Sequence, residues 1–523
     1  MDSVSMEFKE NQNQDVSIRQ NIFLLITTLL LGILSDVLFF EKPLGISIPI
    51  FVLAFYTVFF WNLRGKIKQG ISFGWILSIP ILLLSSTYLF FLNELFMVLN
   101  FVGIPVLIVA QTIIMTGENK YQWHVPIFIV DLIFGMFVRT FRYFARPFTT
   151  IYLFIRPKKE SKKLAAFGKI TIGLLITLPL MLIIISLLAS ADQVFENFMG
   201  EIPKFLMDIN IGEFIPQLVI ILFITLTSYS YLWSFLSKQN SQIVKLSENG
   251  ISPKRVLDPV IIITILISVN IVYAFFTLIQ FTYLFGSANY ALPANVTYAE
   301  YARRGFFELI LVTLINLTIL LCSVNLTKKL NKVMDTFMNS LNSLLVLCTL
   351  VMLISAHLRM SLYEEIFGYT YLRVLTHAFM VFIFALLLVT LVKIWYDKIP
   401  LLKAYIPIAL TAYVVVNFIN IDQMIARNNL ERYHNKGLID VAYLSGLSND
   451  ATPVLVQLLE DKDPNIVSEI QNSLYAKKQA LMRKNQWQAF NISNERAKEV
   501  LSKYKLVYQA PKVRNTSEMN ETR

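Results

Sequence analysis

The sequence is poor in the residues that build metal centres and disulfides. Among 523 residues there are two cysteines, Cys322 and Cys348, and four histidines. Both cysteines fall inside apolar runs, so neither a disulfide framework nor a cysteine-based zinc site is expected. No two histidines stand four residues apart, as the zinc ligands of a metalloprotease helix do. The sequence therefore predicts no metal ion and no cofactor.

Common catalytic motifs are absent as well. The chain contains no GxxxxGK[ST] loop, which would cradle the phosphates of ATP, and no GxSxG elbow, which would present a nucleophilic serine. No set of histidines and carboxylates has a recognisable metal spacing. An enzyme is not excluded by these absences, but the sequence favours a protein without catalytic activity.

Charged residues are also scarce, and apolar residues are concentrated in long runs. Only 15% of the residues are charged, against about 25% in an ordinary soluble protein. Runs of about twenty apolar residues form helices long enough to cross a hydrocarbon core of about 30 Å. We therefore predict an all-α polytopic membrane protein with about eleven transmembrane helices. The predicted spans are 21–40, 46–62, 71–91, 95–116, 168–190, 214–236, 259–285, 305–325, 337–357, 374–394 and 402–420.

The formal net charge of +11 lies mostly in short loops between these runs. Loops 63–70, 139–169 and 326–335 are basic, whereas loop 191–213 is acidic. Because Lys and Arg stay on the cytoplasmic side, this pattern predicts a cytoplasmic N-terminus and an extracytoplasmic C-terminus in the cell membrane. It also predicts that 139–169 contacts anionic lipid headgroups, and it argues against nucleic acid as a partner.

Segment 126–144 is ambiguous, because it is apolar but contains Asp131, Arg139 and Arg142. If it crossed the membrane, the basic stretch that follows would lie outside. We predict an amphipathic helix on the inner membrane surface, with aromatic residues facing lipid and arginines facing headgroups. The alternative is a twelfth span with a polar face.

The composition becomes polar and helix-compatible after Asn420. Helices are predicted at Ile421–Asn435, after Asp440 and Asn449 as N-caps, after Asp463, and from Ser493. This segment is predicted to offer a docking face for a protein partner. The predicted organisation is a cytoplasmic N-terminus (1–20), four spans (21–116), a basic cytoplasmic segment with the interfacial helix (117–167), seven spans (168–420), a soluble extracytoplasmic helical segment (421–510) and a disordered tail (511–523).

The stretch Tyr298–Leu309 carries an unusual density of charge at the entry to a predicted span. Glu300, Arg304 and Glu308 are four residues apart in turn, so a helix would place them on one stripe, bordered by Tyr301 and close to Arg303. An unpaired carboxylate inside an apolar run is costly, and Arg304 is the natural partner of Glu308. The stripe is either an ion network that stabilises the fold or a site for a substrate or partner.

A second polar group, predicted to lie in a loop on the same side, could line a shared outward-facing cavity with this stripe. It contains His357, Arg359, Glu364 and Glu365, and His357 is either a group that titrates near neutral pH or an interfacial residue. Four further polar residues fall inside spans, where amides often join helices and a carboxylate can carry protons. They are Asp36, Asn270, Gln280 and Asn316.

Several stretches resemble a known family. Thr297–Leu309 (TYAEYARRGFFEL), preceded by Gln280–Phe285, resembles the signature of a bacterial membrane family catalogued as domain of unknown function 4173. Ser190–Phe195 and the segments Ile425–Tyr433, Ile439–Leu444 and Leu447–Pro453 agree with it. The resemblance implies a bacterial multi-pass protein of the cell envelope. It implies no activity, so no catalytic residue is carried over.

Three functions remain open from the sequence. The first is a secondary transporter or channel-like protein that uses the outward-facing polar residues as a gate or binding site. The second is an envelope sensor or scaffold that docks a partner through residues 421–510. The third is a membrane enzyme acting on a lipid or wall precursor, with Glu300 or Glu308 as acid or base, and it ranks lowest because no nucleophile is recognisable.

Overall fold

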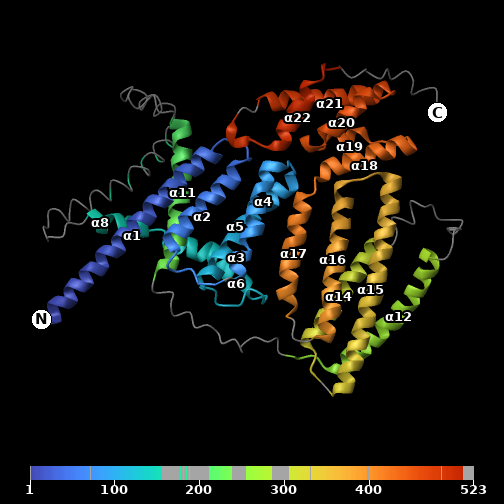
Figure 1. The fold of residues 1–523 in the computed structure, drawn as a ribbon, viewed down its shortest axis with the longest axis horizontal. Coiled ribbons are helices and arrows are strands. Elements are labelled where there is room, and N and C mark those ends of the chain that lie inside the picture. The colour runs from blue at the N-terminus through green and yellow to red at the C-terminus, as the bar shows by residue number, and fades with distance from the viewer. Residues whose placement is uncertain are drawn as a thin grey trace. The chain divides into compact units, whose positions relative to one another are not determined.

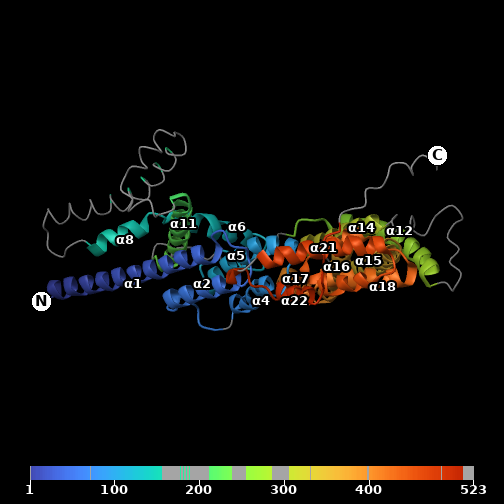
Figure 2. The same cartoon turned by 90° about the horizontal axis from the view of Figure 1, so that it is seen from above.

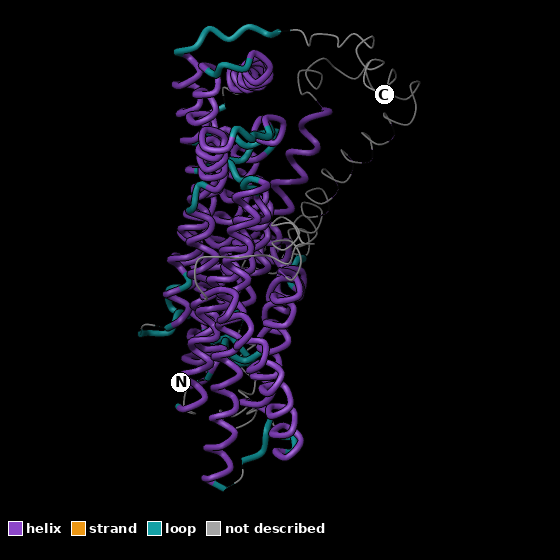
Figure 3. Tube along the Cα trace, turned by 90° about the vertical axis from the view of Figure 1, so that its right-hand side faces the viewer, coloured by secondary structure: helices purple, strands orange, loops and turns teal. Residues whose placement is uncertain are grey.

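A computed structural model describes residues 2–70, 72–155, 211–237, 255–285, 306–329, 331–396, 400–483 and 486–509, with five isolated positions between 173 and 188. The described residues form helices and one isolated β-bridge, but no strand (Figures 1 and 3). The chain divides into two compact units. Unit 1 comprises 1–89, 98–245 and 486–490, and unit 2 comprises 90–97, 246–485 and 491–523.

The helices of unit 1 come mostly from the first half of the chain. They are α1 (Asp2–Phe39), α2 (Ser47–Leu63), α3 (Phe73–Ile76), α4 (Ser78–Phe90), α5 (Glu94–Thr116), α6 (Phe128–Ile133), the π-helix η1 (Phe134–Arg139), α7 (Thr140–Arg142), α8 (Arg146–Ile155) and α11 (Ile211–Leu236). The last residue of α4, Phe90, and the first residues of α5, 94–97, belong to unit 2.

The described part of unit 2 contains five helices that are long and apolar enough to cross a membrane and a set of more polar or shorter ones. They are α12 (Pro259–Phe285), α14 (Phe306–Leu326), α15 (Lys332–Phe367), α16 (Tyr371–Trp395), α17 (Leu401–Phe418), α18 (Ile421–Lys436), α19 (Val441–Ser445), α20 (Thr452–Leu455), α21 (Pro464–Arg483) and α22 (Ile492–Ser502). Seen from above, α18 and α21 lie over α15 and α16 (Figure 2).

Nine helices in the described residues are long and apolar enough to cross a membrane, and the apolar helix α2, with 17 residues, is slightly shorter. The prediction of an all-α polytopic membrane protein is confirmed. Ten of the eleven predicted spans coincide with these ten helices. The eleventh, 168–190, lies outside the continuously described residues, as do the predicted tail 511–523 and most of the basic stretch after Ile155.

Segment 126–144 forms no continuous helix long enough to span. It consists of α6, the π-helix η1 and α7. The expectation that its arginines face headgroups is wrong for Arg139, which is buried. Its guanidinium lies 4.8 Å from the ring centre of Phe235, and its Nη2 donates to the carbonyl of Glu118 at 3.0 Å. Arg142 is exposed, as expected.

Helix α15 lies at the centre of unit 2 and is longer than the sequence indicated. It continues ten residues beyond the predicted end at 357, to Phe367. Its 36 residues span about 54 Å at 1.5 Å per residue, well beyond the thickness of a hydrocarbon core. No Gly or Pro interrupts it before Gly368, which ends it with a φ of 85°. A side chain is strained at that φ, which makes Gly368 the natural stop.

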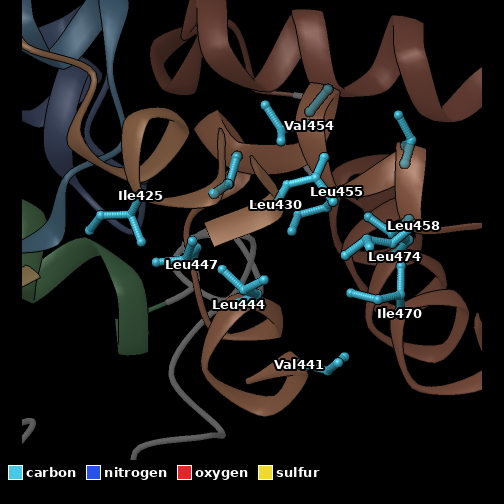
Figure 4. Packing of buried hydrophobic residues seen from close by; sticks show 14 of the residues in the cluster. Ile425, Leu430, Val441, Leu444, Leu447, Val454, Leu455, Leu458, Ile470 and Leu474 are labelled. Atoms are coloured by element: carbon cyan, nitrogen blue, oxygen red, sulfur yellow. The ribbon is translucent and has the colours of Figure 1, made fainter. Parts of the chain in front are cut away.

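The core of the C-terminal helices is shared with the ends of two helices that are long and apolar enough to cross a membrane. Leu444, Leu455 and Leu474 are buried in one cluster that also contains Phe96 from the start of α5 (Figure 4). Tyr371 of α16 packs against the same cluster. Burying these side chains together stabilises the contact between the C-terminal helices and the starts of α5 and α16.

The helix starts in this segment agree only partly with the predicted caps. The carboxylate of Asp440 accepts from the backbone N–H of Tyr443 at 3.0 Å, as predicted. Ser448 rather than Asn449 caps the next turn, by accepting from the backbone of Asp450. The last helix, predicted to begin at Ser493, begins at Ile492 and is capped by Asn491. Both predictions were one residue late because neighbouring residues have similar capping ability.

Candidate functional site

Three titratable side chains form a hydrogen-bonded chain between α15 and α16. Nδ1 of His357 lies 2.8 Å from Nδ1 of His377, and Nε2 of His377 lies 3.0 Å from Oε2 of Glu364. His357 is exposed, whereas the side chains of His377 and Glu364 are 18% and 5% exposed. The chain, called here the His–Glu chain, therefore runs from an exposed imidazole to a buried carboxylate.

The geometry of the two helices brings these residues together. His357 and Glu364 are seven residues apart on α15, which is close to two full turns and places them on one face. Only Gly368, Tyr369 and Thr370 connect α15 to α16, so the two helices form a tight hairpin. His377 lies near the start of α16 and inserts between the other two members.

The hydrogen-bond pattern defines how a proton can be distributed along the chain. An ionised Glu364 can only accept, so it requires an N–H at Nε2 of His377. A neutral His377 then accepts at Nδ1 from the N–H of His357. Within the described residues, the second carboxylate oxygen of Glu364 is buried without a hydrogen-bond partner. The three groups can therefore exchange a proton between the protein surface and a buried position.

The C-terminal segment holds the tip of this hairpin. The side chain of Asn429 donates to the carbonyl of Tyr369 at 2.8 Å and accepts from its N–H at 2.9 Å. Arg432 donates to the carbonyls of Glu365 and Ile366 at 3.1 and 2.8 Å, which occupies two carbonyls that the end of α15 leaves free. A Cβ at Gly368 would lie 2.6 Å from Oδ1 of Asn429, so only glycine fits against this clamp.

The other residues of the second predicted group have separate roles. Glu365 lies next to Glu364 in sequence but is exposed, and its carboxylate is 3.5 Å from Nζ of Lys436. Arg359 is half-buried on α15. The expectation that all four residues lie in a loop was wrong, because α15 remains helical through this region.

The signature stretch is mostly outside the described residues. This holds for Glu300, Tyr301, Arg303 and Arg304. Glu308 is described, lies in the first turn of α14 and is exposed. The predicted charge stripe and its proximity to His357 therefore remain predictions.

Two of the predicted intramembrane polar residues join helices. The amide of Asn316 on α14 accepts from the hydroxyl of Tyr273 at 2.8 Å and donates to Thr349 at 3.0 Å, which connects three helices. Asn270 of α12 donates to the carbonyl of Leu341 of α15 at 2.9 Å. These contacts support the interpretation of buried amides as links between helices.

The remaining two predicted intramembrane positions give a different result. Asp36 is half-buried near the end of α1, and its Oδ1 has no hydrogen-bond partner among the described residues. Asp36 belongs to unit 1, whereas the His–Glu chain belongs to unit 2. The side chain of Gln280 lies outside the described residues.

Sequence reasoning missed His377 as a site residue. It was assigned to a span without a role, although an ionisable residue inside a span is itself a functional signal. The i, i+7 spacing of His357 and Glu364 was a second signal, but it counts only if the helix continues past 357. No group of three or more His, Cys, Asp or Glu side chains in the described residues can hold a metal ion.

Comparisons with known proteins identify a family but no activity. The family described as a domain of unknown function (DUF4153) matches residues 78–458, which is most of the chain. The family number predicted from the signature, 4173, was therefore wrong, whereas an uncharacterised family was correctly predicted. No curated protein and no solved structure matches the chain. The chain belongs to the DUF4153 family.

Proposed function

We propose that this protein is a proton-coupled secondary transporter. The observation that carries the proposal is the His–Glu chain, which links exposed His357 through His377 to buried Glu364. Ionisable residues within membrane helices are costly, and proton relays are one of their main uses. A proton that moves along this chain changes the charge inside α15 and α16, which can bias the packing of the hairpin.

The first test measures the movement of charge and needs no substrate. Full-length protein in proteoliposomes on a solid-supported membrane receives a pH jump, and the transient current is integrated. We expect a clear displaced charge in the wild type and a loss of most of it in His377→Gln. His434→Gln is the matched control, because His434 is exposed on α18. Equal charge displacement in the two variants would refute the proposal.

A second candidate function is supported by the clamp. Asn429 and Arg432 hold the tip of the hairpin that carries the His–Glu chain. A proton-dependent movement of this tip would therefore be transmitted to the C-terminal segment, as in a sensor of envelope conditions. A pH jump that moves charge while no solute in a broad panel accumulates in the vesicles would favour the sensor over the transporter.

The orientation remains part of the proposal, with the N-terminus cytoplasmic and the C-terminus extracytoplasmic in a bacterial cell membrane. Within unit 2, the C-terminal segment contacts both Leu92, through Asp450, and the α15–α16 tip. These positions follow the third and ninth predicted spans. Six predicted spans lie between the two positions if 168–190 crosses the membrane and 126–144 does not. An even number of crossings returns the chain to the same side of the membrane, so the shared contact supports the charge-based topology.

The orientation is tested by labelling single cysteines from outside the cell. Cys322 and Cys348 are first replaced by serine, and Lys462→Cys or Lys66→Cys is then introduced at an exposed position. A membrane-impermeant maleimide is expected to label Lys462→Cys in intact cells and Lys66→Cys only after permeabilisation. The opposite pattern would invert the proposed topology.

A further inference from the structure

An open groove lies along one face of α18, from Ile419 to Glu431, apart from the His–Glu chain. Its volume is about 510 Å³, which is within the range of about 300–1,000 Å³ of small-molecule sites. The groove begins at Ile419, directly after α17 ends at Phe418. Because α17 is long and apolar enough to cross a membrane, an occupant of the groove lies next to the membrane surface.

The lining of the groove combines three kinds of side chain. Ile419, which directly follows α17, and Met424, on α18, are apolar. Gln423 and Asn428 offer neutral amide donors and acceptors. Arg427 and Glu431 supply one positive and one negative charge. This lining is suited to a ligand that has an apolar part and both signs of charge.

The two charged residues are spaced for an ion pair but do not form one. Arg427 and Glu431 are four residues apart on α18, a spacing at which side chains commonly interact. Both are exposed, and in the described part of the chain neither side chain makes an ion pair or a hydrogen bond. The groove therefore presents a separate cation and anion within the reach of one small zwitterion.

We propose that this groove binds the headgroup of a phospholipid that carries a primary ammonium. The phosphate lies at Arg427, whose planar guanidinium can donate two hydrogen bonds to it, and the ammonium lies at Glu431. Gln423 and Asn428 donate to ester oxygens, and the acyl chains leave past Ile419 and Met424 towards the hydrocarbon. In such a headgroup a short carbon spacer separates the phosphate from the ammonium. The four-residue spacing on α18 likewise separates Arg427 from Glu431 by about one helical turn.

Other headgroups fit this arrangement less well. A glycerol headgroup supplies the phosphate but leaves Glu431 facing an anionic lipid without a cation. A choline headgroup has no N–H to donate to the carboxylate of Glu431. A soluble zwitterion satisfies both charges but leaves Ile419 and Met424 uncovered. The observed lining therefore favours an ethanolamine-type lipid, and this inference does not depend on proton-coupled transport.

The experiment titrates the full-length protein in detergent with short-chain phospholipids and counts bound lipid by native mass spectrometry. The ethanolamine lipid is expected to bind about tenfold more tightly than the glycerol lipid, since only its ammonium can donate a charge-assisted hydrogen bond to the carboxylate of Glu431. Glu431→Gln is expected to remove this preference, by weakening ethanolamine-lipid binding and by relieving the repulsion between the carboxylate and the anionic glycerol lipid. Arg427→Gln is expected to weaken both lipids about tenfold.

The matched controls are Glu469→Gln and Arg496→Gln, which remove exposed charges elsewhere in the C-terminal segment and should not change either affinity. The wild-type headgroup comparison needs no substitution, so it decides the matter even if a variant misfolds. Equal affinity of wild type for the two lipids overturns the proposal. So does a preference that persists in Glu431→Gln, or free O-phosphoethanolamine that binds as tightly as the lipid.

Discussion

Two sets of polar side chains lie in the same bundle and differ in one chemical property. The first set links α12, α14 and α15 and consists of Asn270, Tyr273, Asn316 and Thr349. The amides and the threonine hydroxyl in this set do not change charge at any ordinary pH. At the tip of the α15–α16 hairpin, the linked groups are two imidazoles and a carboxylate. The first set can only hold helices together, whereas the second can also take up and release protons.

The comparison shows why burial alone does not identify a functional residue. Asn316 is fully buried and Glu364 nearly so. Asn316 bonds to two other helices through both atoms of its amide, so its hydrogen-bonding capacity is used for packing. Glu364 has one bonded oxygen and one without a partner in the described residues. A buried polar group that is both titratable and incompletely bonded is the better candidate for chemistry.

The largest stability effect is expected from breaking the first set. Asn316→Ala removes two interhelical hydrogen bonds and leaves the Tyr273 hydroxyl and Thr349 without this partner. We expect a loss of about 1–3 kcal/mol in unfolding free energy, with unchanged charge displacement in a pH jump. Unfolding in mixed detergent micelles measures the loss.

The matched control for this variant is Asn325→Ala on the same helix. Among the described residues, the amide of Asn325 donates only to the carbonyl of Leu321, within α14. Its removal should cost clearly less than that of Asn316. If both variants lose the same stability, the contacts to α12 and α15 do not hold the bundle together, and the contrast between the two polar sets disappears.

A smaller effect is expected from Asp422, a buried titratable group outside both sets. Burial raises the pKa of Asp422 above its ordinary value, nearby Asp450 adds to this, and Ser448 and Lys477 act in the opposite direction. Because the folded-state pKa is raised, its stabilising contribution is complete below the unfolded value of about 3.9 and is lost as pH rises through the folded value. Asp422 therefore makes the folded C-terminal segment less stable at neutral pH than at acid pH.

Asp422→Asn is expected to reduce the pH dependence of stability by a small amount. The decrease in Tm between mildly acid and neutral pH should be smaller in the variant than in the wild type. Asp440→Asn serves as the control, because it removes an exposed carboxylate while an asparagine still caps α19. An unchanged pH dependence in Asp422→Asn would show that its carboxylate is not perturbed by burial.

The long apolar runs were sufficient to predict the membrane helices, and local signals predicted much of the C-terminal segment. Apolar length has a direct physical meaning in a bilayer, which is why ten predicted spans coincide with helices. Asp440 was correctly predicted as a cap because an N-cap needs only its own side chain and the next few backbone N–H groups.

The His–Glu chain was not predicted because it depends on contacts between helices. Its closest link joins His357 to a residue twenty positions away on the next helix. We expected the span to end at 357, so His357 and Glu364 were not assigned to one helix, on which their spacing places them on the same face. Gly368 was the sequence signal that could have corrected this, since a glycine commonly ends a helix and none occurs between 357 and 368.

The central claim is that Glu364 exchanges a proton inside the bundle, and two adjacent glutamates allow a direct test. Glu364 is buried in the His–Glu chain, whereas Glu365 is exposed and pairs with Lys436. Each is changed to glutamine, and the charge displaced by the same pH jump is compared in proteoliposomes. The account predicts that Glu365→Gln retains nearly all of the wild-type charge and that Glu364→Gln loses most of it. Equal charge in the two variants would contradict it.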